Sequence, residues 1–200
     1  MVSGFLRDAC GPRPIVAGHD VGALLALRAV MGGELQPSKL IVMPCSLHRR
    51  TTRARRERAV LALARAGALP VLDRAVTHAA HAVFRPKAGE QLTASGNPAA
   101  RDLVRHAMKD VPGNRNRARA WARLAARWEH APGDVLDGYR AVTCPTLLLW
   151  AGRDPLHPVE WAEEALDLLP DAQLRILPGT GFLMAYDDPV GLAREIAAWV

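Results

Sequence analysis

The 200-residue sequence has few cysteines, few lysines and no long apolar run. Its three cysteines, Cys10, Cys45 and Cys144, form no Cys-x-x-Cys pair, which argues against a zinc ribbon or a disulfide scaffold and predicts three separate buried thiols. No stretch approaches the roughly 20 apolar residues that a membrane-spanning helix needs. The first eight residues contain no apolar signal-peptide core. We therefore expect a cytoplasmic protein without a membrane partner.

Aromatic residues make up only 5% of the chain, and the charge is uneven. Residues 46–130 carry eighteen basic and six acidic side chains, a net charge of +12, whereas residues 131–200 have a net charge of −7. A basic block can indicate a nucleic-acid or polyanion partner. This one lacks the interleaved aromatics of a single-strand binder and matches no helix-turn-helix or zinc-finger spacing. We expect no nucleic-acid partner and keep a basic polyanion-binding module as an alternative.

Short apolar runs alternate with helical patterns at both ends of the sequence. Four runs, bounded by glycine or proline, predict buried strands at residues 14–17, 39–43, 144–150 and 173–177. Between and after them, the patterns predict helices at residues 21–31, 158–169 and 189–200. Continuous apolar strands that alternate with helices favour an α/β fold, with a parallel sheet covered by helices on both faces.

The middle of the chain has no comparable strand. Its patterns predict helices at residues 53–69, 70–83, 98–109 and 115–129, and these coincide with the basic block. The sequence therefore predicts an α/β core in two pieces, residues 1–45 and 139–200, interrupted by a helical insertion at residues 46–138.

The most informative motif lies directly after the first predicted strand. Residues 18–22 read Gly-His-Asp-Val-Gly and lead into a helix, which is the strand–turn–helix context of a nucleophile elbow. We expect both glycines to be needed because a sharp turn leaves no room for a Cβ. The central position usually holds serine and here holds Asp20, whose carboxylate can act as a nucleophile. The Val21 N–H, at the helix N-terminus, is placed to stabilise an oxyanion.

At these residues the chain resembles the α/β-hydrolase family, and residues 18–22 resemble its aspartate-nucleophile branch, the epoxide hydrolases and haloalkane dehalogenases. The resemblance extends over the whole chain and includes the helical cap and the segment Cys-Pro-Thr-Leu-Leu-Leu-Trp-Ala-Gly-Arg-Asp at residues 144–154. It implies that Asp20 is the nucleophile, Asp154 its acid partner and Val21 N–H an oxyanion donor. It also implies a small apolar epoxide or haloalkane as substrate, with no cofactor and no metal.

Two departures from the family pattern affect this expectation. The family's histidine follows the last strand in a Gly-x-Gly-His turn, and here Phe182 stands at that position. A carboxylate needs no base for the first attack, but hydrolysis of the resulting ester does, so we expect little or no turnover. His157, three residues after Asp154, is a candidate displaced base, although a histidine in a loop more commonly has only local bonds.

The second departure is at the front of the chain. The family core has eight strands and its elbow follows the fifth, whereas here the elbow begins at residue 18. We therefore expect the elbow strand to form an open edge, through which the chain could form an oligomer. A fragment or mis-assigned start, a decaying gene and a minimal protein all remain open explanations. The alternative to an enzyme is a non-catalytic ligand-binding or interaction protein on the same fold.

Overall fold

The computed structural model describes residues 2–47, 87–110, 116–117, 120 and 138–200. The chain divides into two compact units: residues 1–49, 93–95 and 133–200 form the first, and residues 50–92 and 96–132 form the second. Most of the predicted insertion lies outside the described residues, so its boundaries at 46 and 138 stay a prediction.

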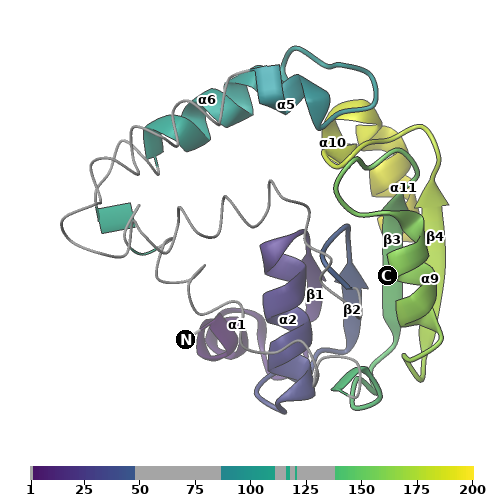
Figure 1. Cartoon of the computed structure of the whole chain (residues 1–200). Coiled ribbons are helices and arrows are strands. Elements are labelled where there is room, and N and C mark those ends of the chain that lie inside the picture. The colour runs from purple at the N-terminus through teal and green to yellow at the C-terminus, as the bar shows by residue number, and fades with distance from the viewer. Residues whose placement is uncertain (1, 48–86, 111–115, 118–119, 121–137) are drawn as a thin grey trace. The chain divides into compact units, whose positions relative to one another are not determined.

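The first unit is built on a four-stranded parallel sheet in the order β1-β2-β3-β4 (Figure 1). The parallel sheet predicted from the apolar runs is thus confirmed, and each strand agrees with its predicted position to within two residues. The strands are β1 (Ile15–Gly18), β2 (Lys39–Val42), β3 (Thr146–Ala151) and β4 (Ala172–Leu177).

Strand β1 lies at one edge of this sheet, as expected. Within the described residues it pairs only with β2, with Ile15 opposite Lys39 and Gly18 opposite Val42. The Ile15 side chain is 46% exposed, which is unusual for an apolar residue of a parallel strand. Whether another chain pairs with this edge stays a prediction.

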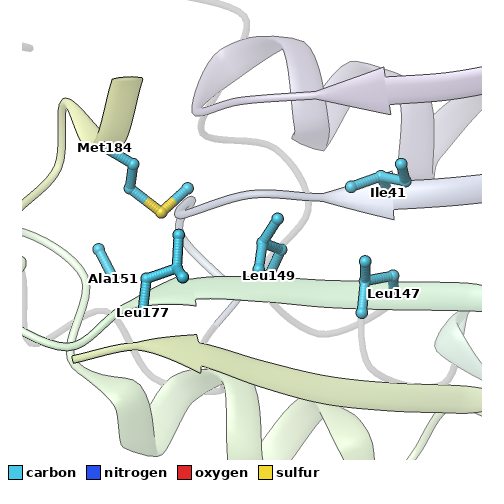
Figure 2. Close-up of a cluster of buried hydrophobic side chains, with 6 residues drawn as sticks. All are labelled: Ile41, Leu147, Leu149, Ala151, Leu177 and Met184. Atoms are coloured by element: carbon cyan, nitrogen blue, oxygen red, sulfur yellow. The ribbon is translucent and has the colours of Figure 1, made fainter. Parts of the chain in front are cut away.

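One face of the sheet carries a continuous apolar cluster (Figure 2). Because side chains alternate along a strand, Leu147, Leu149 and Ala151 of β3 point to the same face. Helix α11 (Pro189–Trp199) covers this face, and Asp188 accepts a hydrogen bond from the Gly191 N–H at the start of that helix. The cluster consists of Ile41, Leu147, Leu149, Ala151, Leu177 and Met184, with Met43, Leu192, Ile196 and Trp199 packed against it.

The remaining helices of the first unit follow the predicted pattern. Helix α2 (Val21–Met31) packs against β1, and α9 (Val159–Leu166) packs against β3 and β4. Helix α1 (Val2–Cys10) precedes β1. The Trp150 side chain, on the face opposite Leu149, donates its indole N–H to the carbonyl of His157, just before α9. Helices therefore cover both faces of the sheet.

In the second unit, helix α5 (Lys87–Gln91) packs closely against α6 (Ala100–Asp110). A Cβ on Gly89 would lie 2.2 Å from the carbonyl oxygen of Ala100, so only glycine permits this approach. Glu90 and Arg101 form an ion pair between the two helices. Helix α6 agrees with the predicted helix at residues 98–109, whereas the helices expected at 53–69 and 70–83 lie outside the described residues.

Three features differ from expectation or were missed. The short helices α5 and α10 (Met184–Asp187) were not predicted, because four or five residues carry no clear hydrophobic period. Cys10 is exposed at the end of α1 and Cys144 is only partly buried, so the prediction of three buried thiols is confirmed only for Cys45. None of the helices in the described part has the length and apolar character needed to cross a bilayer.

Stability should depend strongly on the cluster of Figure 2. We expect Leu149→Ala to lower the free energy of unfolding by about 2–5 kcal/mol, because it leaves a cavity in a fully buried layer. Val190→Ala, at a side chain that is 74% exposed, should change it by less than about 0.5 kcal/mol. Urea unfolding followed by circular dichroism measures both values, and equal effects of the two variants would contradict the packing described here.

Candidate active site

The turn between β1 and α2 has the geometry of a nucleophile elbow. Asp20 has φ 52° and ψ −122°, and it is the one non-glycine residue with positive φ in the described part of the chain. Such a conformation costs an L-residue on the order of 1–3 kcal/mol and persists only where the surroundings enforce it. Here the Asp20 N–H donates to Pro44 O at 3.0 Å and the Met43 N–H donates to Gly18 O at 2.9 Å, which ties the turn to the end of β2.

The two glycines of the motif are not equivalent. A Cβ on Gly18 would lie 2.5 Å from the Cα of Ala23, so the close approach of strand and helix requires glycine there. Among the described residues, a Cβ on Gly22 would meet nothing within 4 Å outside the backbone of its own helix. The expectation that both glycines are needed for space is therefore wrong for Gly22.

The Asp20 carboxylate does not cap α2. Aspartate is favoured before a helix because its side chain accepts hydrogen bonds from the first turn. Here the left-handed backbone turns the side chain away, and no cap hydrogen bond forms. The carboxylate has no hydrogen-bond partner among the described residues. The Val21 N–H begins the helix, at a position that helix geometry leaves without an intrahelical acceptor.

The loops after β3 and β4 are joined to each other at the same edge of the sheet. The Gly152 N–H donates to Leu177 O and the Arg153 N–H donates to Thr180 O, both at 2.9 Å. A Cβ on Gly152 would lie 2.7 Å from the Cα of Pro178, so glycine is needed for this contact as well. Because the carboxyl ends of parallel strands meet at one edge, these loops lie on the same side of the sheet as the elbow.

These contacts position a buried carboxylate–imidazole pair. Asp154 Oδ2 lies 3.0 Å from His157 Nδ1, and Asp154 Oδ1 accepts the Leu156 N–H at 2.7 Å. Both side chains of the pair are buried. The sequence named Asp154 as an acid and His157 as a candidate base, and the structure joins them directly.

Phe182 contacts two imidazole rings. Its ring centroid is 4.4 Å from that of His19 and 5.4 Å from that of His157. His19 Nε2 lies 3.1 Å from Phe182 O. Burial lowers the pKa of His19, and the neighbouring Asp20 carboxylate and the Phe182 carbonyl only partly oppose this effect. His19 is therefore mostly neutral near pH 7.

A second carboxylate, Asp187, fixes the turn that carries Phe182. Its Oδ2 accepts the N–H groups of Ala94 and Gly181, each at 2.8 Å, and its Oδ1 accepts the N–H and hydroxyl of Ser95. Burial would raise the pKa of Asp187, but the Ser95 hydroxyl and the three backbone N–H groups outweigh burial and lower it. Sequence analysis missed this anchor, because its donors are backbone groups about 90 residues away.

Tyr139 Oη is buried, and it is the only such side-chain N or O atom in the described part without a hydrogen-bond partner. Within the described part, no group of three or more His, Cys, Asp or Glu side chains could hold a metal ion.

Comparison with known proteins agrees with this geometry. A model of the alpha/beta hydrolase family matches residues 2–195. The chain belongs to the alpha/beta hydrolase family. No curated protein sequence matches this alpha/beta hydrolase significantly.

Solved structures share its fold at low sequence identity. An esterase from Thermogutta terrifontis is 18% identical with a TM-score of 0.73, over 99% of this chain and 68% of the esterase. An esterase from Exiguobacterium antarcticum is 17% identical with a TM-score of 0.70, over 99% and 70% of the two chains. MenH from S. aureus is 17% identical with a TM-score of 0.71, over 98% and 71%. At these identities the likeness shows the fold alone.

The elbow of this alpha/beta hydrolase yields a matched pair of variants. We expect Gly18→Ala to lower the free energy of unfolding by more than about 2 kcal/mol, because its Cβ would overlap the backbone of Ala23. Gly22→Ala should raise stability by up to about 1 kcal/mol, because alanine is the better helix former and its Cβ meets open space. Thermal and urea unfolding compare the two variants, and a tolerated Gly18→Ala would contradict the elbow geometry.

The Asp187 anchor predicts a specific pH dependence. The pKa of the Asp187 carboxyl is lower in the folded protein than its ordinary value of 3.8. The ionised carboxylate therefore stabilises the fold fully at pH values above 3.8, and this stabilisation is lost as the pH falls through the pKa of the folded state. Asp187→Asn should destabilise the protein by on the order of 1 kcal/mol at pH 7, because the amide NH2 would face N–H donors. The difference from wild type should shrink below pH 4. Glu164→Gln, at an exposed position, serves as control, and a pH-independent Asp187→Asn effect would refute the assignment.

Proposed function

We propose that this protein acts on a small apolar haloalkane or epoxide, and that the Asp20 carboxylate attacks a saturated carbon to form an alkyl–enzyme ester. The proposal rests on one observation: the backbone of Asp20 is held at φ 52°, and its carboxylate makes no capping hydrogen bond to the helix that follows. Strain of this kind concentrates at functional sites, because it persists only where the fold enforces it. A structural aspartate at this position would instead cap the helix.

The chemistry of a carboxylate favours carbon electrophiles with a leaving group. With a primary alkyl bromide, a bond forms between Asp20 Oδ and the carbon while the carbon–bromine bond breaks, and bromide leaves with the electron pair. Attack on an ester carbonyl would give a mixed anhydride that readily reverts. The esterase activity named for two similar structures therefore does not carry over to this elbow.

The surroundings of Asp20 support the proposal that its carboxylate attacks an apolar alkyl substrate. The Phe182 ring packs on His19, the neighbour of Asp20, so an apolar side chain lies close to the elbow, as an alkyl substrate would require. The Val21 N–H at the start of α2 could stabilise negative charge on the ester carbonyl oxygen during hydrolysis. Asp154 is the acid partner of the site through its bond to His157.

Trapping the ester tests the proposal. The protein is incubated with a reactive primary alkyl bromide, quenched in acid at short times and digested. We expect the peptide containing Asp20 to gain the mass of the alkyl group, with one bromide released per ester formed. Because Cys10 is exposed and also reacts with alkyl bromides, the experiment uses a Cys10→Ser background.

Two variants make this result decisive. Asp20→Asn should abolish both the added mass and the bromide release, whereas Asp8→Asn, at an exposed carboxylate on α1, should leave both unchanged. Alkaline hydroxylamine should remove the added mass, since it cleaves esters and leaves thioethers intact. The absence of both the added mass at short times and any bromide release that depends on Asp20 would refute the proposal and favour a non-catalytic binding protein.

A further inference from the structure

The Asp154–His157 pair has the arrangement of a base with its orienting acid. A carboxylate can only accept hydrogen bonds, so the 3.0 Å contact requires a proton on His157 Nδ1. In the neutral imidazole this leaves a lone pair on Nε2, the atom that takes a proton in a general base. The Leu156 N–H holds the other carboxylate oxygen and the Trp150 indole holds the carbonyl of His157, so both partners are fixed.

The second nitrogen of His157 is open. Nε2 has no hydrogen-bond partner among the described residues. The residue as a whole is 6% exposed. Nε2 is therefore the ring nitrogen that is left to bind the water molecule of the step proposed below.

The pair and the neighbour of Asp20 contact the same phenylalanine. The His157 ring packs on Phe182 at 5.4 Å, and Phe182 packs at 4.4 Å on His19, which directly precedes Asp20. Asp154, His157 and Asp20 all lie near enough to His19 for their charges to affect its pKa. His19 is the poorer base, because its Nε2 is already directed at Phe182 O and burial lowers its pKa.

We propose that His157, supplied by the loop of the acid, is the general base that hydrolyses the ester on Asp20, at a site where Phe182 occupies the usual histidine position. This inference rests on the proposed function of Asp20. It replaces the expectation of negligible turnover with slow but complete turnover, because the pair that activates water is present at a displaced position.

The hydrolytic step is balanced. His157 Nε2 takes a proton from water, and the hydroxide attacks the carbonyl carbon of the Asp20 ester. The tetrahedral oxyanion, stabilised by the Val21 N–H, collapses and breaks the bond between that carbon and the alkoxide oxygen. The alkoxide takes the proton back from His157 and leaves as an alcohol, so Asp20 is regenerated. Together with ester formation, one haloalkane and one water give one alcohol, one proton and one halide.

The test separates ester formation from ester hydrolysis. The ester is formed with excess alkyl bromide, the bromide is removed by desalting, and the decay of the alkylated Asp20 peptide is followed by mass spectrometry. We expect His157→Gln to form the ester at the wild-type rate and to hydrolyse it about 10²- to 10⁴-fold more slowly. His106→Gln, at an exposed histidine of α6, is the matched control and should behave as wild type.

Chemical rescue distinguishes a base from a residue that merely supports the fold. After desalting, added imidazole should accelerate ester decay in His157→Ala and not in wild type, because free imidazole can replace the missing base. Asp154→Asn should slow ester decay without slowing ester formation, as expected for a residue that positions the base.

The outcomes are distinct for the two proposals. Ester decay in His157→Gln at the wild-type rate, or a wild-type ester that persists as long as that of the variant, would overturn the role of His157 while leaving Asp20 as nucleophile. Failure of every variant and of the wild type to form an ester would overturn the proposed function itself. Circular dichroism and thermal unfolding confirm that each variant is folded before its kinetics are compared.

Discussion

The site depends on one strained peptide turn. Asp20 sits at positive φ between β1 and α2, and the strain is enforced on both sides. On one side the Gly18 backbone packs so tightly on Ala23 that a Cβ has no space, and on the other the Asp20 N–H bonds to Pro44 O. The same constraint that destabilises the backbone turns the carboxylate away from the helix it would otherwise cap. Local strain thereby leaves the carboxylate available for the proposed nucleophilic attack.

The parallel sheet brings the proposed base, His157, to the same edge as the proposed nucleophile, Asp20. Parallel strands direct all their carboxyl ends to one edge, so the loops after β1, β3 and β4 converge although they are far apart in sequence. Backbone bonds from Gly152 and Arg153 then join the acid loop to the turn of Phe182. In the proposed mechanism the imidazole comes from the loop of Asp154, as His157. Phe182 packs against both His157 and His19.

Much of the fold could be predicted from the sequence, since β1 to β4 are continuous apolar runs and α2, α9 and α11 have clear starts and stops. The position of Asp20 was equally predictable, because the glycine pattern has meaning only between a strand and a helix. The features that could not be predicted from the sequence depend on contacts between distant residues or belong to very short elements. Helix α10 has four residues, and the Asp187 anchor binds backbone groups from another part of the chain. The three-residue spacing of Asp154 and His157 was a visible signal for their contact, but only the structure shows that His157 and His19 pack on the same ring, that of Phe182.

The most direct test of the central claim, that Asp20 itself forms the ester, is isotopic. A single turnover of an alkyl bromide is carried out in H2¹⁸O with enzyme in excess, and the Asp20 peptide and the alcohol are both analysed by mass spectrometry. If water attacks the carbonyl carbon of the ester, one ¹⁸O atom enters the Asp20 carboxylate and the alcohol keeps the unlabelled oxygen of Asp20. Label found only in the alcohol, with none in Asp20, would mean that water attacks the substrate directly and would contradict the account.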